Sequence, residues 1–353
     1  MIHWLKEIGR GKRGARDLTY DEALQAADAI LTGKATPAQI GAFFLAERIK
    51  MESVEELAAF ADICRSHAAR TVHPGSLDCA GPYDGRAKSF MATFATAFVL
   101  AAAGQRVTLH GMPSLPPKWG VTPVDLLREL GVDAATLPVE QAIRTATDTG
   151  VLFASAEQWC PPLLSLRSIR EELGMRTVLN TAEKLVDYGQ SPYIVFGVFH
   201  NTVFERMSSL ISRLGYERGL IVQGAEGSED LFIHRPTRTY RVENGEAHLQ
   251  VINPEAYGLE QEPPELAWDA PLQLATTREV LQGTAHMAFV HQVLLNAAVR
   301  LELTGRASSV EEGIYTCKAL LDSGEPWRLF QRWQQSLQPK TAADSVAQQA
   351  LQP

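Results

Sequence analysis

The sequence predicts an α/β protein with a small all-helical unit near its N-terminus and a larger domain built on a mostly parallel sheet. Three observations lead to this fold class. Three helix-start signals follow one another within the first seventy residues, short apolar runs alternate with helical patterns afterwards, and 45% of the 353 residues are hydrophobic. A chain of this length and apolar content buries a large core. Strands that alternate with helices are typical of a parallel sheet.

Each of the three early helix starts is a capping box, in which a hydroxyl and a side-chain carboxylate or amide satisfy exposed N–H groups of the first turn. The boxes are Thr19-x-x-Glu22, Thr36-Pro37-x-Gln39 and Ser53-x-x-Glu56. Pro37 stands at the first helical position, where its missing N–H costs nothing. Apolar residues follow each box at helical spacing, so residues 18–68 are predicted to form a compact helical unit.

From residue 76 the pattern changes to alternating strands and helices. Residues 106–110, after Gly104, form a β-like segment. Short continuous apolar runs at residues 152–153 and 194–199 predict strands buried on both faces, and residues 219–222 predict another buried strand. Helical patterns occupy residues 90–103, 124–130 and 204–214. Residues 237–253 resemble an antiparallel addition to the sheet, and the Gln-, Ala- and Ser-rich tail after Trp333 is expected to fray.

The segment Asp78-Cys79-Ala80-Gly81-Pro82-Tyr83-Asp84-Gly85 precedes the apolar run 90–103 and is interpreted as a loop. A short glycine-containing loop before a helix can direct N–H groups and the helix dipole at an anion. Pro82 has no N–H, however, and Tyr83 places a ring where a phosphate cradle needs bare backbone. The loop is therefore either a reduced anion site or only a strand-to-helix connection.

Charge and cysteine usage narrow the class of protein further. A formal net charge of −8 argues against bulk affinity for nucleic acid. Four scattered cysteines without a C-x-x-C pair indicate free thiols of a reducing compartment. The N-terminus has no apolar run typical of a signal peptide, and residues 90–103 are shorter than the ~20 residues of a membrane span. The sequence thus predicts a cytoplasmic protein with no membrane partner.

Several stretches together resemble the anthranilate phosphoribosyltransferase family, also called glycosyltransferase family 3. They are residues 31–44, 169–180, 294–298 and 305–313. The resemblance runs from about Leu18 to Trp333 and implies a nucleoside phosphorylase/phosphoribosyltransferase-like fold and a homodimer paired through its helical domain. The domain division that follows is a basic N-terminal arm at 1–17, a helical dimerisation domain at 18–72 and about 165–190, an α/β domain at 73–164 and 191–338, and a flexible tail at 339–353.

The resemblance also implies a ligand site. In active family members a Gly-Thr-Gly-Gly-Asp cradle binds diphosphate, and it falls on residues 80–84 here. Positions that match the family's contacts to phosphoribosyl diphosphate or to the acceptor carboxylate are Gly81, Asp84, Thr93, His110, Gly111, Lys118 and Arg170.

For the metal, the resemblance implies Mg²⁺ bound by an acidic pair, which appears here in reverse order as Glu229-Asp230. Carboxylate oxygens suit such a hard cation. The pair follows the predicted strand 219–222, and sites in α/β sheets gather at the carboxyl ends of strands. The alternative interpretation of two adjacent acids is a solvated turn.

Many donors of the active members are missing from this chain. The family's Asn-x-Ser-Thr falls on Met91-Ala92-Thr93-Phe94, and its Lys-His-Gly-Asn falls on Leu109-His110-Gly111-Met112. The negative charge of a bound diphosphate would therefore be poorly compensated. The sequence predicts a family member with a degenerate phosphoribosyl-diphosphate site that binds a small phosphorylated or carboxylated molecule. Any catalysis there would be pentosyl transfer.

The first residues support a second hypothesis. Residues 7–18 resemble a divergent branch of the family that has lost the phosphoribosyl-diphosphate motif, and some of its members bind nucleic acid non-specifically as dimers. Cations interleaved with glycines can follow a phosphate backbone. The candidate cations are Lys6, Arg10, Lys12, Arg13 and Arg16, with Arg86 and Lys88 beside the cradle. The alternative function is a non-catalytic nucleic-acid-binding homodimer.

Overall fold

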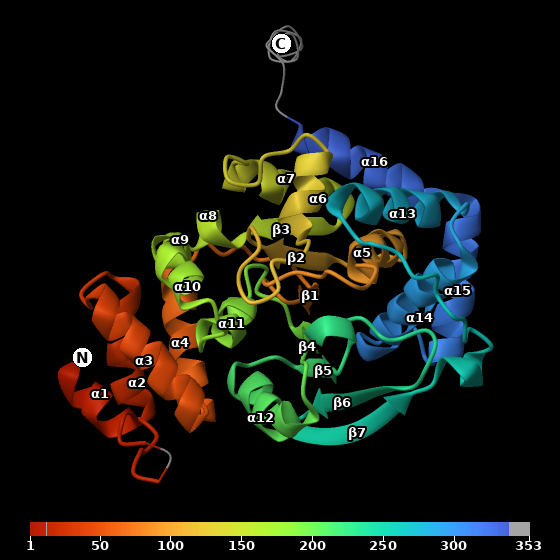
Figure 1. The fold of residues 1–353 in the computed structure, drawn as a ribbon. Coiled ribbons are helices and arrows are strands. Elements are labelled where there is room, and N and C mark those ends of the chain that lie inside the picture. The colour runs from red at the N-terminus through yellow and green to blue at the C-terminus, as the bar shows by residue number, and fades with distance from the viewer. Residues whose placement is uncertain (12, 339–353) are drawn as a thin grey trace, which may run out of the picture.

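The computed structural model describes residues 1–11 and 13–338, and it consists of a helical part and a sheet-containing part (Figure 1). The helical part contains α1 (Ile2–Ile8), α2 (Tyr20–Leu31), α3 (Pro37–Lys50) and α4 (Val54–His67). Three short helices from the middle of the chain pack against it, namely α9 (Pro161–Ser165), α10 (Arg167–Leu173) and α11 (Leu179–Ala182). The helical part is therefore built from two separate stretches of sequence.

All three predicted capping boxes are present. Thr19, Thr36 and Ser53 each accept a hydrogen bond from the backbone N–H three residues on, and the side chain at that position accepts one in return. Helix α1 was not indicated by the sequence pattern. It precedes the first box, in the segment predicted to be a basic arm, and it buries Trp4 and Ile8 where it packs on α3.

A seven-stranded sheet forms the core of the larger part, in the order β3-β2-β1-β4-β5-β6-β7. Five strands are parallel: β1 (Leu77–Ala80), β2 (Val107–Gly111), β3 (Val151–Ser155), β4 (Tyr193–Gly197) and β5 (Arg218–Val222). The antiparallel addition is β6 (Thr237–Glu243) with β7 (Glu246–Ile252). These strands confirm the predicted fold class, although Asp78–Ala80 belong to β1 and not to the loop.

The chain order changes direction between β1 and β4. From β1 the chain adds β2 and β3 on one side, and β4 and β5 lie on the other. In open α/β sheets such a switch point opens a crevice at the carboxyl ends of the two strands. The segments that leave β1 and β4, beginning at Gly81 and Val198, are therefore the expected place for a ligand.

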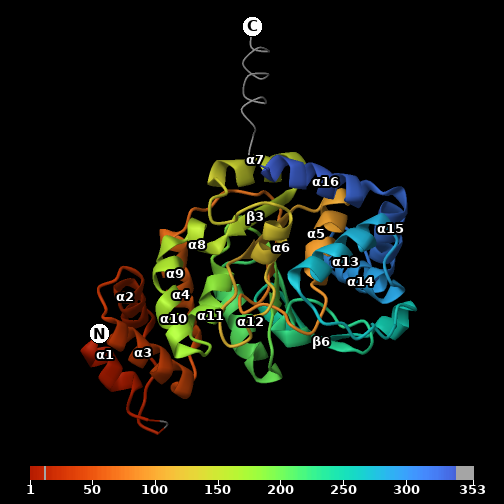
Figure 2. The ribbon, with the colours of Figure 1, turned by 45° about the horizontal axis from the view of Figure 1, so that its top comes forward.

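Helices cover both faces of the sheet (Figure 2). Helix α5 (Ala92–Ala102) is buried along most of its length, because helices from the C-terminal part surround it. This surrounding layer contains α13 (Ala270–Gln282), α14 (Met287–Leu303), α15 (Val310–Ser323) and α16 (Glu325–Leu337). The other helices are α6 (Pro123–Glu129), α7 (Val139–Thr149), α8 (Ala156–Trp159) and α12 (Phe204–Arg213), and 3₁₀ turns occur at Glu183–Leu185, Asn201–Val203, Ala225–Gly227 and Pro254–Tyr257.

Within residues 1–11 and 13–338, no helix combines the length and apolar character that crossing a membrane demands. Lys12 and the tail predicted at residues 339–353 lie outside the described residues.

Candidate functional site

The turn after β1 brings two predicted residues against neighbouring loops. Gly81 lies close to Glu229: a Cβ at position 81 would lie 2.6 Å from Oε2 of Glu229, so a larger residue would displace that carboxylate. Asp84 is buried, and its carboxylate lies 2.9 Å from Nζ of Lys118 and 2.8 Å from Nη2 of Arg176. The predicted residues Asp84 and Lys118 therefore meet. Arg176 is an additional partner that the sequence reasoning missed, although it lies inside the stretch 169–180.

The side chain of Tyr83 points into the protein and contacts His110. Its side chain is buried, and its hydroxyl lies 2.6 Å from Nδ1 of His110. The other ring nitrogen of His110 lies 3.0 Å from Oδ1 of Asp78. Burial raises the pKa of the Tyr83 hydroxyl well above its usual value, so that the phenol stays protonated. These contacts make Tyr83 and His110 parts of one buried polar group. Gly111, which ends β2, packs against Pro123.

Asp230 has protein cations as partners. Its carboxylate lies 2.8 Å from Nη1 of Arg86 and 3.1 Å from Nη2 of Arg300, and all three side chains are buried. Thr93 donates to it from its hydroxyl at 2.7 Å and from its backbone N–H at 3.1 Å. Two guanidinium groups therefore already compensate this carboxylate. Arg86, predicted as a cation of a nucleic-acid surface, lies inside the protein, which differs from that expectation.

The structure leaves only part of the predicted Mg²⁺ pair available. Among the described residues, no three His, Cys, Asp or Glu side chains converge as a metal-binding group. Asp230 is held by two arginines, whereas the carboxylate of Glu229 lies beside Gly81 and forms no ion pair or hydrogen bond with the described residues. Mg²⁺ in proteins is usually held by one or two carboxylates together with water and substrate phosphates. Glu229 is therefore the member of the pair whose oxygens are open to such an ion.

Arg170, predicted to grip an acceptor carboxylate, lies against a carboxylate of the protein. Its Nη1 and Nη2 donate to the two oxygens of Glu183 at 2.6 and 3.0 Å. The side chains of both residues are at most 2% exposed. Burial raises the pKa of Glu183, and the Arg170 guanidinium opposes this rise. The pair joins α10 to the 3₁₀ turn that follows α11.

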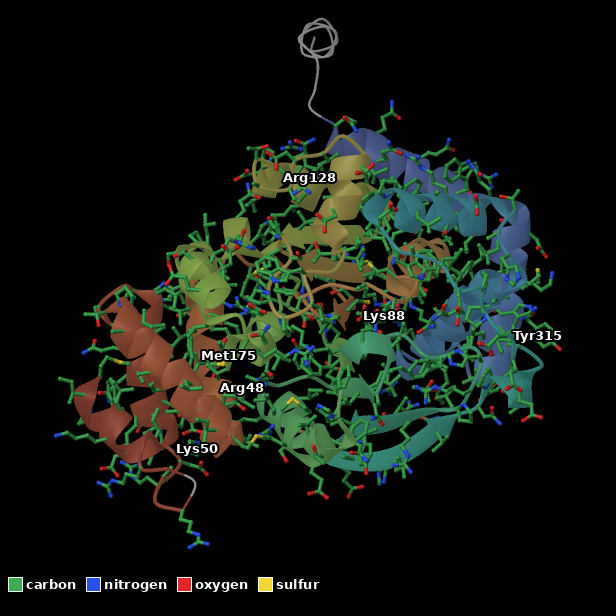
Figure 3. The ribbon with its side chains drawn as sticks, in the orientation of Figure 1. Arg48, Lys50, Lys88, Arg128, Met175 and Tyr315 are labelled. Atoms are coloured by element: carbon green, nitrogen blue, oxygen red, sulfur yellow. The ribbon has the colours of Figure 1, made fainter. Side chains whose placement is uncertain are left out.

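A cleft of about 390 Å³, here called the interdomain cleft, separates the helical part from the carboxyl ends of β1 and β4. Arg48 of α3 contributes to it, and Figure 3 labels Arg48 and Met175 on the side of the helical part that faces the sheet. Hydroxyl and amide groups of α11 line the cleft, together with four cations and three carboxylates. The cations are Arg48, Arg176, Lys184 and Arg206, and the carboxylates are Glu52, Asp84 and Glu226.

Lys184 is the most perturbed cation of this cleft. Burial lowers its pKa to about 7, although the carboxylates of Glu229 and Asp84 oppose the change. Its Nζ donates to the carbonyl of Gly197 at 2.8 Å and lies 3.8 Å from the centre of the Phe196 ring. Sequence spacing gave no sign of this lysine, because its surroundings come from β4 and from the loops after β1 and β5.

The predicted basic arm is partly neutralised by acids of the helical part. Arg10 pairs with Glu7 at 2.7 Å, and Arg16 pairs with Glu22 at 2.7 Å. Lys6, Arg13 and Lys88 are exposed and take part in no ion pair within the described residues.

Comparison with known proteins agrees with this arrangement. The description "Glycosyl transferase family, helical bundle domain" matches residues 3–68, and "Glycosyl transferase family, a/b domain" matches residues 77–326. Anthranilate phosphoribosyltransferase of Thioalkalivibrio sulfidiphilus is 34% identical over 314 residues, covering 87% of this chain and 91% of the relative. The enzyme of Chloroflexus aggregans is 33% identical over 313 residues, covering 88% and 91%.

Solved structures give the same result. The crystal structure of anthranilate phosphoribosyltransferase from Thermus thermophilus aligns with a TM-score of 0.83 at 28% identity, covering 94% of this chain and 98% of that one. The Saccharomyces cerevisiae enzyme in complex with PRPP and Mg shares the fold, with a TM-score of 0.80 at 19% identity and coverage of 95% and 97%. The chain therefore belongs to the glycosyl transferase family that has a helical bundle domain and an α/β domain, as an anthranilate phosphoribosyltransferase-like protein.

Proposed function

We propose that this protein binds a small phosphorylated or carboxylated molecule in the interdomain cleft and is not an efficient phosphoribosyltransferase. The observation that carries the proposal is the distribution of charge around the crevice. Four cations line the cleft against three carboxylates, and the carboxylate of Asp230 beside it is already compensated by two buried arginines. The site is thus suited to receive an anion and poorly suited to hold a divalent cation.

The cleft can bind an anion with little rearrangement. Arg176 reaches Asp84 from the cleft wall and can instead direct its planar guanidinium at two oxygens of a ligand. The amine of Lys184 lies in the same wall, and a bound anion favours its protonated form. Arg48 and Arg206 extend the positive surface towards the helical part.

Transfer chemistry has less support. One relative's structure contains PRPP and Mg, but here the positions corresponding to the metal-binding pair are Glu229 and Asp230, and the carboxylate of Asp230 is held by two buried arginines. Proline and tyrosine replace two glycines of the cradle. If transfer survives, it is pentosyl transfer at a rate far below about 1 s⁻¹, the low end of ordinary enzyme turnover.

A titration followed by thermal unfolding tests this proposal. We expect phosphoribosyl diphosphate to stabilise the protein equally with and without Mg²⁺, by about 2.7 kcal/mol at 100 times its Kd. Arg176→Gln is expected to weaken this binding, and Arg128→Gln, on the distant helix α6, serves as its control. Mg²⁺-dependent binding together with anthranilate turnover near 1 s⁻¹ would refute the proposal.

We also propose a homodimer that pairs through the helical part. Helix α3 buries Ile40, Phe43 and Phe44 inside its own domain but exposes Leu45 and Ile49. Exposed apolar side chains on one short element are typical of an interface. Light scattering during size-exclusion chromatography should give twice the chain mass, and Ile49→Glu should reduce it to the chain mass.

Non-specific nucleic-acid binding stays a prediction of the sequence. Lys6, Arg13 and Lys88 expose their charges, whereas Arg86 is buried. Binding of a short DNA duplex should weaken with rising salt at a slope of about −0.9 per phosphate contact if these cations act.

A further inference from the structure

A second cleft, of about 1080 Å³, lies beside the interdomain cleft at the carboxyl end of β5. Its walls come from the turn after β5, the approach to β6, the segment after β4 and the loop after β1. We call it the β6 cleft. Phe199 and Glu226 line both clefts and so mark the boundary between them.

The β6 cleft is strongly positive although the whole chain is acidic. Its lining cations are Lys88, Lys118, Arg235 and Arg238. The side chains of Lys88, Arg235 and Arg238 are exposed and form no ion pair or hydrogen bond with any residue that the structure describes. Unpaired cations gathered in a concave surface attract anions.

The one carboxylate among the lining residues that the structure describes offsets only part of the charge of the four lining cations. Both oxygens of Glu226 accept hydrogen bonds from the loop after β1: from the N–H groups of Ala87 at 2.9 Å and Lys88 at 3.0 Å, and from the hydroxyl of Ser89 at 2.8 Å. These bonds fix the loop so that Lys88 stands at the rim. Figure 3 labels Lys88 near the middle of the molecule, away from Arg128 on α6.

Two aromatic rings accompany the cations. Phe199 is 49% exposed although it is a large apolar side chain, and Phe232 is partly exposed in the same cleft. The guanidinium of Arg235 lies 3.8 Å from the centre of the Phe232 ring. A cation next to an accessible ring can bind a phosphate while the ring packs against a flat heterocycle.

We propose that the β6 cleft binds a nucleoside phosphate. The phosphates contact Lys88, Arg235 and Arg238, and the base lies against Phe199 or Phe232. A cleft near 1,000 Å³ is of the size that accommodates a small organic ligand. This site adjoins the ligand site proposed in the interdomain cleft and shares Phe199 and Glu226 with it, but its cations differ from Arg48, Arg176, Lys184 and Arg206 of that cleft.

Fluorescence titration of the full chain with a mant-labelled adenosine diphosphate tests the proposal. The double variant Arg235→Gln/Arg238→Gln is expected to bind the probe at least tenfold more weakly. The matched control is Arg128→Gln/Arg144→Gln, which removes two exposed arginines from α6 and α7 and is expected to bind as the unaltered protein does. Thermal unfolding of each variant verifies that it is folded.

Two further measurements define the ligand and the site. Unlabelled adenosine diphosphate should displace the probe at least tenfold more effectively than inorganic diphosphate or adenosine alone, because cations and rings both contribute. Arg48→Gln, at a residue that lines the interdomain cleft and not the β6 cleft, should leave probe affinity within twofold, which distinguishes this site from the interdomain cleft. The proposal is overturned if the unaltered protein does not bind the probe, if Arg235→Gln/Arg238→Gln binds it unchanged, or if inorganic diphosphate competes as well as the nucleotide. Loss of binding in Arg48→Gln alone would equally overturn it.

Discussion

Replacing Arg170 by methionine should lower the free energy of unfolding, because Arg170 pairs with a carboxylate of the protein and not with a ligand. The change keeps an unbranched side chain in α10 but removes the guanidinium that donates twice to Glu183, at 2.6 and 3.0 Å. The side chain of Glu183 has no exposed surface, so water cannot take over those bonds. A carboxylate would then be left buried without its counter-charge.

The size of this effect follows from the burial of the pair. Removing one partner of a buried ion pair typically costs about 3–5 kcal/mol. Coulomb attraction leads to the same range, since two unit charges about 4 Å apart attract by about 4 kcal/mol at an effective dielectric of 20. Because burial already raises the pKa of Glu183, loss of Arg170 raises it further, and protonation then relieves part of the cost at acid pH. The destabilisation should therefore be larger at pH 8 than at pH 5.

Thermal and urea unfolding at both pH values measure the effect. For Arg170→Met we expect Tm to fall by about 6 °C or more at pH 8, at roughly 2–4 °C per kcal/mol for domains of 150–250 residues. Adding Glu183→Leu should recover most of the loss, because two packed apolar side chains replace the pair. Arg144→Met, at an exposed position of α7, is the matched control and should change stability by no more than about 0.5 kcal/mol. An unchanged Tm combined with lost anion binding would refute this reasoning and make Arg170 a ligand residue.

Three other predictions concern buried charges. Burial, with the neighbouring Glu56 carboxylate, raises the pKa of Glu47 to about 8, so the native state holds a proton that the unfolded chain releases near 4.5. Stability should fall as pH rises from about 4.5 to 8, and urea midpoints of Glu47→Gln should lack this contribution. Burial lowers the pKa of Lys184 to about 7 in the native state, from 10.5 in the unfolded chain. Between these two pH values the amine is protonated in the unfolded chain and neutral in the native protein. Stability should therefore rise between about pH 7 and 10, and Lys184→Met should lose this rise. Asp230→Asn leaves Arg86 and Arg300 without their counter-charge and should lower the free energy of unfolding in urea by about 3 kcal/mol. Mg²⁺ should change the stability of neither this variant nor the unaltered protein. A Mg²⁺-dependent change in the unaltered protein would contradict this expectation.

Local patterns predicted most of the secondary structure correctly. The capping boxes at Thr19, Thr36 and Ser53 start α2, α3 and α4 at the expected residues, because capping involves side chains only three positions apart. The apolar runs predicted the buried strands and α5, because an element that is buried on all sides has few polar residues along its length. Strand β1 was missed because Asp78 interrupts its apolar character, and α1 was missed among the charges of the first residues.

Sequence patterns and motifs predicted the family and the order of helices and strands correctly. Which charged side chains pair with one another became apparent from the packing of distant segments. Asp230 meets Arg86 and Arg300 across separations of 144 and 70 positions, and Asp84 meets Arg176 across 92. The spacing of residues along a helix or strand reports which face is buried, but it carries no information on which distant charge shares that burial. A buried charge must find a partner because desolvation is costly, and the packing of distant segments determines which partner it finds.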